Sequence, residues 1–384
     1  MSAETVIEDL IQQRFDNLFL DVKAAQLNLQ NEKKPTLNVV ERAQSKTSRA
    51  LLNVEKQAIK QKDIDEKIDL NILKTVAGNI NVEVEQRLQN DFKDPNNLYS
   101  KVLGLDTELP KLLDLVCVKA ATISKIEPVA NELPWLFNDL MKFVNQSKYQ
   151  RIDKNEEVIV VDTMRKGLSF FGLENLVLIL STLAFRRTLP QITDPFPQIK
   201  LRIWEEAIAT ANSCKQIASL VGVRQNDAFC LGMLQMMGKV VVTKLFFRQF
   251  EKVQREALIA SQKELKHEDY AALTRLTPSG TFLNQLIDKY ALTISANLLD
   301  NMAMKRIFIA NAMRELSSHQ PASNLSPLAR VLKQGTAYAQ YRLLSFHKLI
   351  DLQQSKDFIG TLDLPKGSLK LLKATDMRSL NLKV

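Results

Sequence analysis

Apolar side chains recur every three or four residues along most of this chain, and this spacing constrains the fold more than any other feature. Between residues 5 and 29, for example, Ile7, Leu10, Ile11 and Phe15 follow one another at helical spacing. Glycine and proline, which interrupt helices, number only 11 and 12 among 384 residues. The sequence therefore predicts an all-α protein.

The N-terminal part is expected to contain three helices, over residues 5–29, 36–76 and 79–92. The second is rich in Lys, Glu, Gln and Asp and has few apolar positions, so it needs a partner helix or a neighbouring domain to stabilise it. From Leu109 onward, shorter helices with denser apolar faces are separated by prolines. We therefore place a boundary near residue 107.

Three regions follow from this boundary. We expect an N-terminal helical region over residues 1–107 and a helical domain over 108–345. Residues 346–384 are expected to form a basic tail that is helical or partly ordered.

The three cysteines, Cys117, Cys214 and Cys230, are far apart and form no CxxC pair, which argues against disulfides and thiolate zinc sites. The acidic N-terminus does not resemble a signal peptide. Both features predict a cytoplasmic protein. Residues 167–185 carry one charge, Glu174, but this carboxylate lies near the centre of the stretch, so we expect a core helix and no membrane span.

The net charge of +9 is unevenly distributed. Residues 1–107 carry 15 Lys and Arg against 17 Asp and Glu, so the whole positive excess lies in the rest of the chain. An excess of this kind permits an acidic partner such as a nucleic acid.

Four stretches carry a family resemblance. Residues 108–110 and 133–149 include an opening Leu-Pro, a Leu-Pro-Trp-Leu helix start and an Asn-Gln-Ser-Lys-Tyr ending. Residues 166–176 have the pattern of a helix interrupted by glycine, with lysine at their first position. The remaining two stretches are residues 204–211 with 228–239, and residues 326–337.

Together these stretches resemble the HDOD family, bacterial regulatory domains related to the HD phosphohydrolases. The most specific stretch, 204–211 with 228–239, is similar to the family's Trp-x-His-Ser-x-x-Thr-Ala and Ala-Phe-x-x-Gly-Leu-Leu-His-Asp-Ile-Gly-Lys. The resemblance implies an HD-like helical fold and a role in signal transduction, and residues 1–107 and the tail lie outside it.

The resemblance also assigns the metal-ligand positions of the HD relatives. Glu206 stands at the first His, Gln235 and Met236 at the His-Asp pair, and Thr336 at the last Asp. An amide, a thioether and a hydroxyl do not supply the charge that holds a hard divalent cation. We therefore expect no metal, no cofactor and no catalytic residue, and we expect Met233, Met236 and Met237 to fill the vacated space.

The three histidines do not change this expectation, because none belongs to a pair at metal-binding spacing. His319, in Ser-His-Gln-Pro, is similar to a His-His-x-Pro turn of the relatives, but an exposed loop position is the simpler expectation.

Two groups of basic residues are candidates for a binding patch. The first flanks a proline-rich loop and the second lies in the tail, where a terminal helix packed on the domain is the simpler alternative. They comprise Arg186, Arg187, Lys200, Arg202, Lys366, Lys370 and Lys373.

The sequence thus predicts a non-catalytic bacterial signalling protein that acts through a protein partner, with an HDOD-like domain as scaffold or interaction module. Two alternatives stay open. One is a divergent metal-dependent phosphohydrolase, and the other is a regulator that binds nucleic acid or nucleotides.

Overall fold

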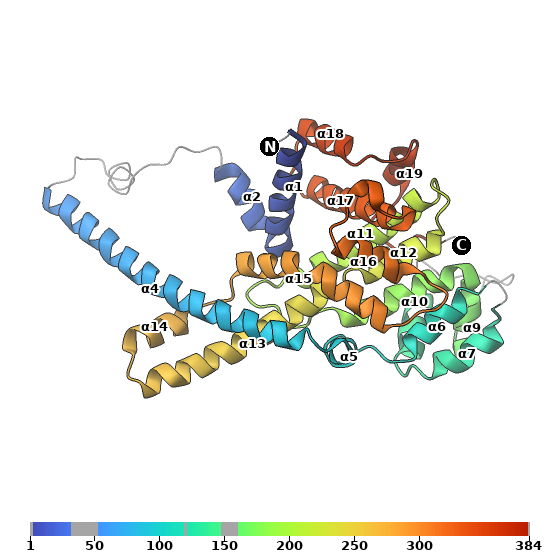
Figure 1. Cartoon of the computed structure of the whole chain (residues 1–384), viewed down its shortest axis with the longest axis horizontal. Helices are drawn as coiled ribbons and strands as arrows, with labels where there is room; N and C mark the ends of the chain where they lie inside the picture. Colours follow the sequence, from blue (N-terminus) through green and yellow to red (C-terminus); the bar gives the residue numbers. More distant parts are fainter. Residues whose placement is uncertain (1–2, 32–52, 119–120, 147–159, 383–384) are drawn as a thin grey trace.

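The computed structural model describes residues 3–31, 53–118, 121–146 and 160–382. Within these ranges the secondary structure is helical and contains no strand, which confirms the predicted all-α class (Figure 1). The helices share one continuous apolar core that extends from Ile11 near the N-terminus to Leu380 near the C-terminus.

The chain begins with two helices, α1 (Ala3–Leu20) and α2 (Val22–Asn31), where the sequence predicted one. The break lies at Asp21, whose side-chain oxygen accepts hydrogen bonds from the backbone N–H groups of Lys23 and Ala24, at 2.6 and 3.1 Å. A short acidic side chain that satisfies the first N–H groups of a following helix is a typical helix start. Apolar spacing alone did not reveal this cap.

The helix α4 (Asn53–Asp91) joins two segments that the sequence separated near residue 78. Gly78 lies within α4, and an added Cβ there would meet no atom beyond the neighbouring helix backbone within 4 Å. The second half of α4 buries Val76, Ile80, Val84 and Leu88. It packs on α13 (Met237–Lys263) and α14 (His267–Arg275), while its first turns reach the edge of the molecule (Figure 1). Residues 36–52 of the predicted second helix lie outside the described residues.

Short helices joined by tight turns follow. They are α5 (Pro95–Asn97), the π-helix η1 (Leu98–Val102), α6 (Leu109–Val116), α7 (Ile123–Asn131), α8 (Leu136–Val144), α9 (Met164–Phe170) and α10 (Leu173–Thr188). The chain bends by 111° between α9 and α10, at Gly172, whose φ of 74° suits glycine. The apolar stretch 167–185 is therefore not one straight helix.

One helical stretch of the described residues, Gln225–Lys263, is long and apolar enough to cross a membrane. Within the protein, 89% of its most apolar window is buried. The core helix of a folded domain has the same properties.

The centre of the molecule is α11 (Ile199–Ala218), which is buried along almost its whole length. α12 (Gln225–Leu234) and α17 (Pro327–Phe346) pack against it, and α15 (Gly280–Asn301) packs on α13 and on α16 (Ile309–Ser317). Gly335 permits the close contact between α17 and α11, because a Cβ there would lie 2.4 Å from the Sγ of Cys214.

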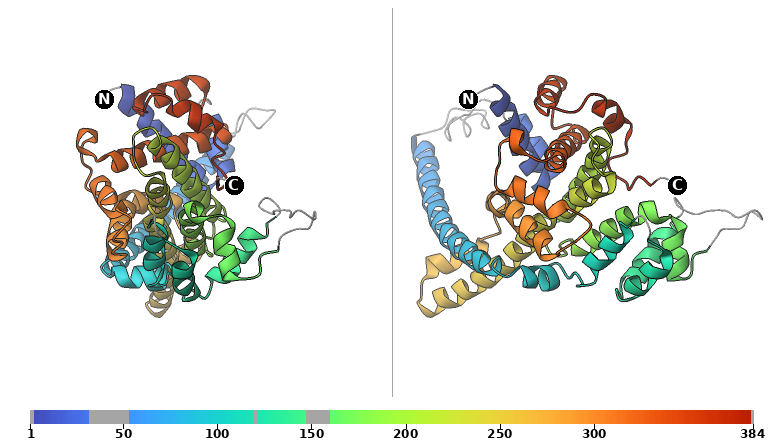
Figure 2. Two further views of the ribbon diagram at one scale, coloured as in Figure 1. Left: turned by 90° about the vertical axis from the view of Figure 1, so that its right-hand side faces the viewer. Right: turned by 45° about the vertical axis from the view of Figure 1, so that its right-hand side comes forward.

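The C-terminal residues fold back onto this centre (Figure 2). α18 (Leu352–Thr361) contacts α1 and α17, and α19 (Ser368–Ala374) contacts α11. Beyond α19, Asn212 of α11 donates a hydrogen bond to the carbonyl oxygen of Ser379 at 2.9 Å, and Lys215 donates one to that of Asn381 at 3.0 Å. The tail is thus a packed part of the structure.

Candidate functional site

The four positions matched to metal ligands line a single cleft of about 560 Å³. Glu206 comes from the middle of α11, Gln235 and Met236 lie between α12 and α13, and Thr336 comes from α17. The packing of α17 on α11 and α12 brings these residues together although they are far apart in the sequence.

The only strong ligand among them, Glu206, is engaged in an ion pair. Its carboxylate is 2% exposed, and its Oε2 lies 2.6 Å from the Nζ of Lys239 in the first turn of α13. Gly238 fixes this turn, since its N–H donates to the Oγ of Ser295 at 2.8 Å and a Cβ would lie 1.9 Å from the carbonyl oxygen of Ala291. The close approach of α13 to α15 therefore holds Lys239 beside Glu206.

Helix α1 covers this ion pair, although it lies far from the matched stretches in the sequence. The Nζ of Lys239 lies 5.5 Å from the ring centroid of Phe15 and 5.1 Å from that of Phe19. Both rings are buried, and Gln12 of the same helix lines the cleft. Aromatic faces stabilise a neighbouring ammonium group, so α1 contributes to the environment of Lys239.

Two more carboxylates act on this cluster, Asp16 from α1 and Asp288 from α15. Burial, and next the charge of Asp288, raise the pKa of Asp16 to about 6, against a smaller opposing effect of Lys239. Burial also raises the pKa of Asp288, and the charge of Glu206 acts in the same direction. The charge of Lys239 lowers the pKa values of both groups in part, so three carboxylates share the charge of one ammonium group. The sequence analysis missed Asp16 and Asp288 because they lie outside the matched stretches.

The residues at the cleft do not fit a divalent metal. Besides Glu206, which is paired with Lys239, the matched positions offer an amide, a thioether and a hydroxyl. Within the described part of the chain, no group of three or more His, Cys, Asp or Glu residues is placed to hold a metal ion. A hard cation needs several charged or carbonyl oxygens around one point, and this donor set does not provide them.

The three methionines fill the vacated space only in part. Met233 and Met237 are fully buried, and Met236, 2% exposed, forms part of the cleft wall. The expectation that they fill the space therefore needs correction, because a cleft of about 560 Å³ stays open beside them.

A family model for the HDOD domain matches residues 107–280. The chain contains an HDOD domain. This match covers the helices from α6 to α14. It ends well before residue 345, and the fourth matched stretch lies beyond it.

Three solved structures are similar to the chain. A protein from Shewanella amazonensis SB2B named as a phosphohydrolase has 15% identity and a TM-score of 0.40, and the alignment covers 72% of this chain and 97% of that one. A second from the same organism, named as a metal-dependent phosphohydrolase, has 12% identity and a TM-score of 0.41, with 76% and 99% covered. A signal transduction protein, so named, from Marinobacter aquaeolei VT8 has 16% identity and a TM-score of 0.42, with 76% and 66% covered. No curated protein matches.

The cleft is completed by elements outside the residues that match the HDOD domain. Thr336 on α17, Asp288 on α15 and Gln12 on α1 all line it. His319 and Lys333 also line it, and both are exposed. His319 lies just after the end of α16, with a φ of 51°. It is an exposed loop residue, as the sequence predicted, and it also lines the cleft.

The predicted basic residues are not gathered into one patch. Arg186 and Arg187 line a separate cleft of about 360 Å³ between α8 and α10, where Arg187 also contacts Asp139 at 3.3 Å. Lys200 donates to the side chain of Gln191 at 2.7 Å, and Lys366, Lys370 and Lys373 are exposed on and before α19.

Arg202 points away from solvent. It is 7% exposed and forms an ion pair with Glu205, and its Nη1 lies 2.8 Å from the Nε2 of His347. Arg378 of the tail approaches the other oxygen of Glu205 at 3.4 Å. The prediction that Arg202 forms part of a basic binding patch is therefore corrected, because its guanidinium group is buried and paired with Glu205.

The cysteines offer no reactive thiol. Burial raises the pKa of Cys117 to about 12, and it also raises the pKa values of Cys214 and Cys230. Because the thiolate is the nucleophilic form, these side chains are suited to packing.

Proposed function

We propose that this HDOD protein is a non-catalytic regulatory module that relays a signal to a protein partner. The observation that carries the proposal is the ion pair between Glu206 and Lys239 at the metal-ligand position. It supplies a positive charge from the protein itself beside the only carboxylate among the four matched residues. The family's regulatory character supports the signalling part of the proposal.

The ion pair disfavours a metal for a physical reason. A divalent cation at Glu206 would have to displace the ammonium group of Lys239, whose side chain is 15% exposed and lies near two aromatic rings. The displaced ammonium would lose its partner in a low-dielectric environment, which costs several kcal/mol. The remaining amide, thioether and hydroxyl would not offset that cost.

The test measures metal content and turnover on the purified full-length chain. We expect less than stoichiometric Mn, Fe, Mg and Zn, and no hydrolysis of bis-p-nitrophenyl phosphate above background when these metals are added. Stoichiometric metal, together with turnover that is lost in Glu206→Ala and kept in the exposed control Glu251→Ala, would establish a phosphohydrolase and refute the proposal.

The partner is tested separately by affinity capture from the native cell. The protein captured by the wild-type chain should bind the purified chain directly, and variants of the cleft should change this binding. Failure of any captured protein to bind directly would remove the signalling part of the proposal.

A further inference from the structure

The cleft left at the metal position has an unusual balance of charge for a protein with a net charge of +9. Glu206 and Asp288 line it together with Lys239 and Lys333. Asp16 adds a third carboxylate beside Lys239, while Lys333 is exposed at the rim. Around the Glu206–Lys239 pair, negative charge therefore exceeds positive charge.

A second feature of the cleft is a buried donor that has no partner. Gln235 is 8% exposed, and its Nε2 donates no hydrogen bond to any described residue, whereas its backbone carbonyl oxygen accepts from Ser295 at 2.6 Å. An unsatisfied buried donor costs about 1 to 3 kcal/mol. An acceptor atom supplied from the cleft would remove that cost.

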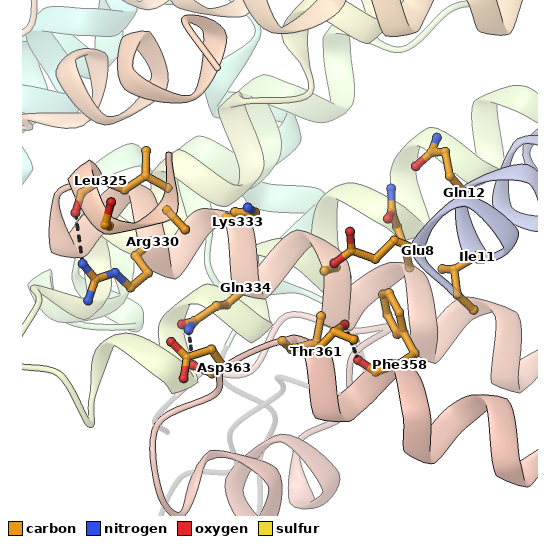
Figure 3. A pocket seen from close by; sticks show the side chains of 15 residues that line it. Glu8, Ile11, Gln12, Leu325, Arg330, Lys333, Gln334, Phe358, Thr361 and Asp363 are labelled. Carbon is orange, nitrogen blue, oxygen red and sulfur yellow. Dashed lines mark hydrogen bonds between the residues drawn. The ribbon is translucent and has the colours of Figure 1, made fainter. Parts of the chain in front are cut away.

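A second cavity of about 450 Å³ lies between α1, α17 and α18 (Figure 3). The two chambers share Gln12, Leu325 and Lys333 in their walls. In the second chamber, carboxylates and cations are equal in number, with Glu8 and Asp363 opposite Arg330 and Lys333. Each chamber lies within the range of about 300 to 1,000 Å³ that is typical of small-molecule sites.

We propose that this cleft binds a small molecule with a protonated amine and a neighbouring hydrogen-bond acceptor. The amine lies against the carboxylate of Asp288, which lines the cleft, while Asp16 adds negative charge near Lys239 from outside the cleft lining. The acceptor receives the free N–H of Gln235. A phosphate or other anion would bring further negative charge next to the carboxylates of Glu206 and Asp288, which is electrostatically unfavourable in a partly buried site.

This inference rests on the proposed function and deepens it, because it names the ligand class of the same cleft. Burial is the largest cause of the raised pKa values of Asp16 and Asp288, and the positive charge of Lys239 lowers both values only in part.

The experiment measures binding to the full-length chain by isothermal titration calorimetry in buffer that contains a chelator. The amine probes are putrescine and L-lysine, and the anionic probes are inorganic phosphate and AMP. We expect at least one amine probe to bind at millimolar concentration or below. Asp288→Asn should weaken this binding about tenfold, which corresponds to about 1.4 kcal/mol, and Gln235→Leu should weaken it when the probe carries an acceptor.

Lys333 provides a control in which amine binding should change in the opposite direction. Lys333→Gln removes a positive charge at the rim, so it should strengthen amine binding and weaken anion binding. Asp9→Asn, on an exposed position of α1, should leave binding unchanged. Circular dichroism melting of each variant identifies those that do not fold, and Lys333→Gln keeps the test decisive if Asp288→Asn is one of them.

Three results would overturn the inference: no binding of either amine probe, amine binding that Asp288→Asn and Lys333→Gln leave unchanged, or binding of phosphate or AMP alone. If the chain also contains no metal, the proposed non-catalytic function survives any of these results. Stoichiometric metal with turnover would instead refute the proposed function, whatever the amine probes do.

Discussion

Glu205 and Glu206 are neighbours on α11, yet they enter opposite ionic environments. Glu205 is flanked by two guanidinium groups, from Arg202 and from Arg378 of the tail. Glu206 has one ammonium partner, Lys239, and shares it with Asp16 and Asp288. The first cluster is closed and rich in positive charge, and the second borders an open cleft and is rich in negative charge.

The comparison separates a structural ion cluster from a candidate binding site. Arg378 stacks on the ring of Phe346 at 4.3 Å, so the cluster of Glu205 ties the tail to α11 and α17. The cluster of Glu206 does not balance its own charge, and it borders an open cleft. Substitutions at the first cluster should therefore affect stability, and those at the second should affect ligand binding and pH dependence.

The largest expected effect comes from breaking the cluster of Glu205. Glu205→Leu leaves the guanidinium of Arg202 buried without its carboxylate, and such a change typically costs about 3 to 5 kcal/mol of unfolding free energy. Urea denaturation measures the loss. The matched control is Glu251→Leu, which removes an exposed ion pair with Arg255 and should cost less than about 1 kcal/mol. Equal losses in both variants would contradict the structural role of Glu205.

A smaller loss of unfolding free energy is expected at the cluster of Glu206, in the turn that positions Lys239. Gly238→Ala places a Cβ against the carbonyl oxygen of Ala291, and such overpacking costs about 1 to 3 kcal/mol. Gly78→Ala is the matched control, because it adds a methyl group in open space within α4 and should stabilise by about 0.5 to 1 kcal/mol. Denaturant midpoints measure both, and a neutral Gly238→Ala would show that α13 and α15 are not held this closely.

The two clusters should also respond to pH with opposite sign. At the first, burial, and next the charges of Arg202 and Arg378, lower the pKa of His347 from 6.5 to about 4. The neutral ring is the form favoured on folding. Its contribution to stability is therefore present above about pH 6.5 and is lost as the pH falls through about 4.

The measurement for His347 is unfolding free energy against pH. The wild type should lose stability toward acid more steeply than His347→Gln, which cannot bind the extra proton. Parallel curves for the two proteins over this window would show that His347 keeps an ordinary pKa in the folded state.

The smallest effect on stability is expected at Asp16, where the dependence of stability on pH has the opposite sign. Its pKa is raised from 3.8 to about 6, so the folded protein favours the protonated carboxyl group. The contribution to stability is present below about pH 3.8 and is lost as the pH rises through about 6. Asp16→Asn should therefore stabilise relative to wild type near pH 7.5 and lose that advantage near pH 4. An advantage that does not vary with pH would exclude the raised pKa.

Apolar spacing in the sequence was enough to predict some features of the fold, while others depend on local caps and packing. Helical spacing predicted the all-α class and most helices, but it merged α1 with α2 because the cap at Asp21 is a local hydrogen-bond pattern. It also broke α4 near Gly78, where packing against α13 and α14 overrides the weak helix propensity of glycine. Such boundaries depend on contacts and side-chain caps that apolar periodicity does not encode.

The candidate site could likewise be predicted from the sequence only in part. The sequence, through its resemblance to the family, predicted which residues stand at the metal-ligand positions. Only the tertiary structure decided that Lys239 pairs with Glu206, that α1 covers the pair, and that Asp16 and Asp288 join it. Periodicity specifies which face of a helix is buried, but the partner of a buried charge comes from whichever distant helix packs against that face.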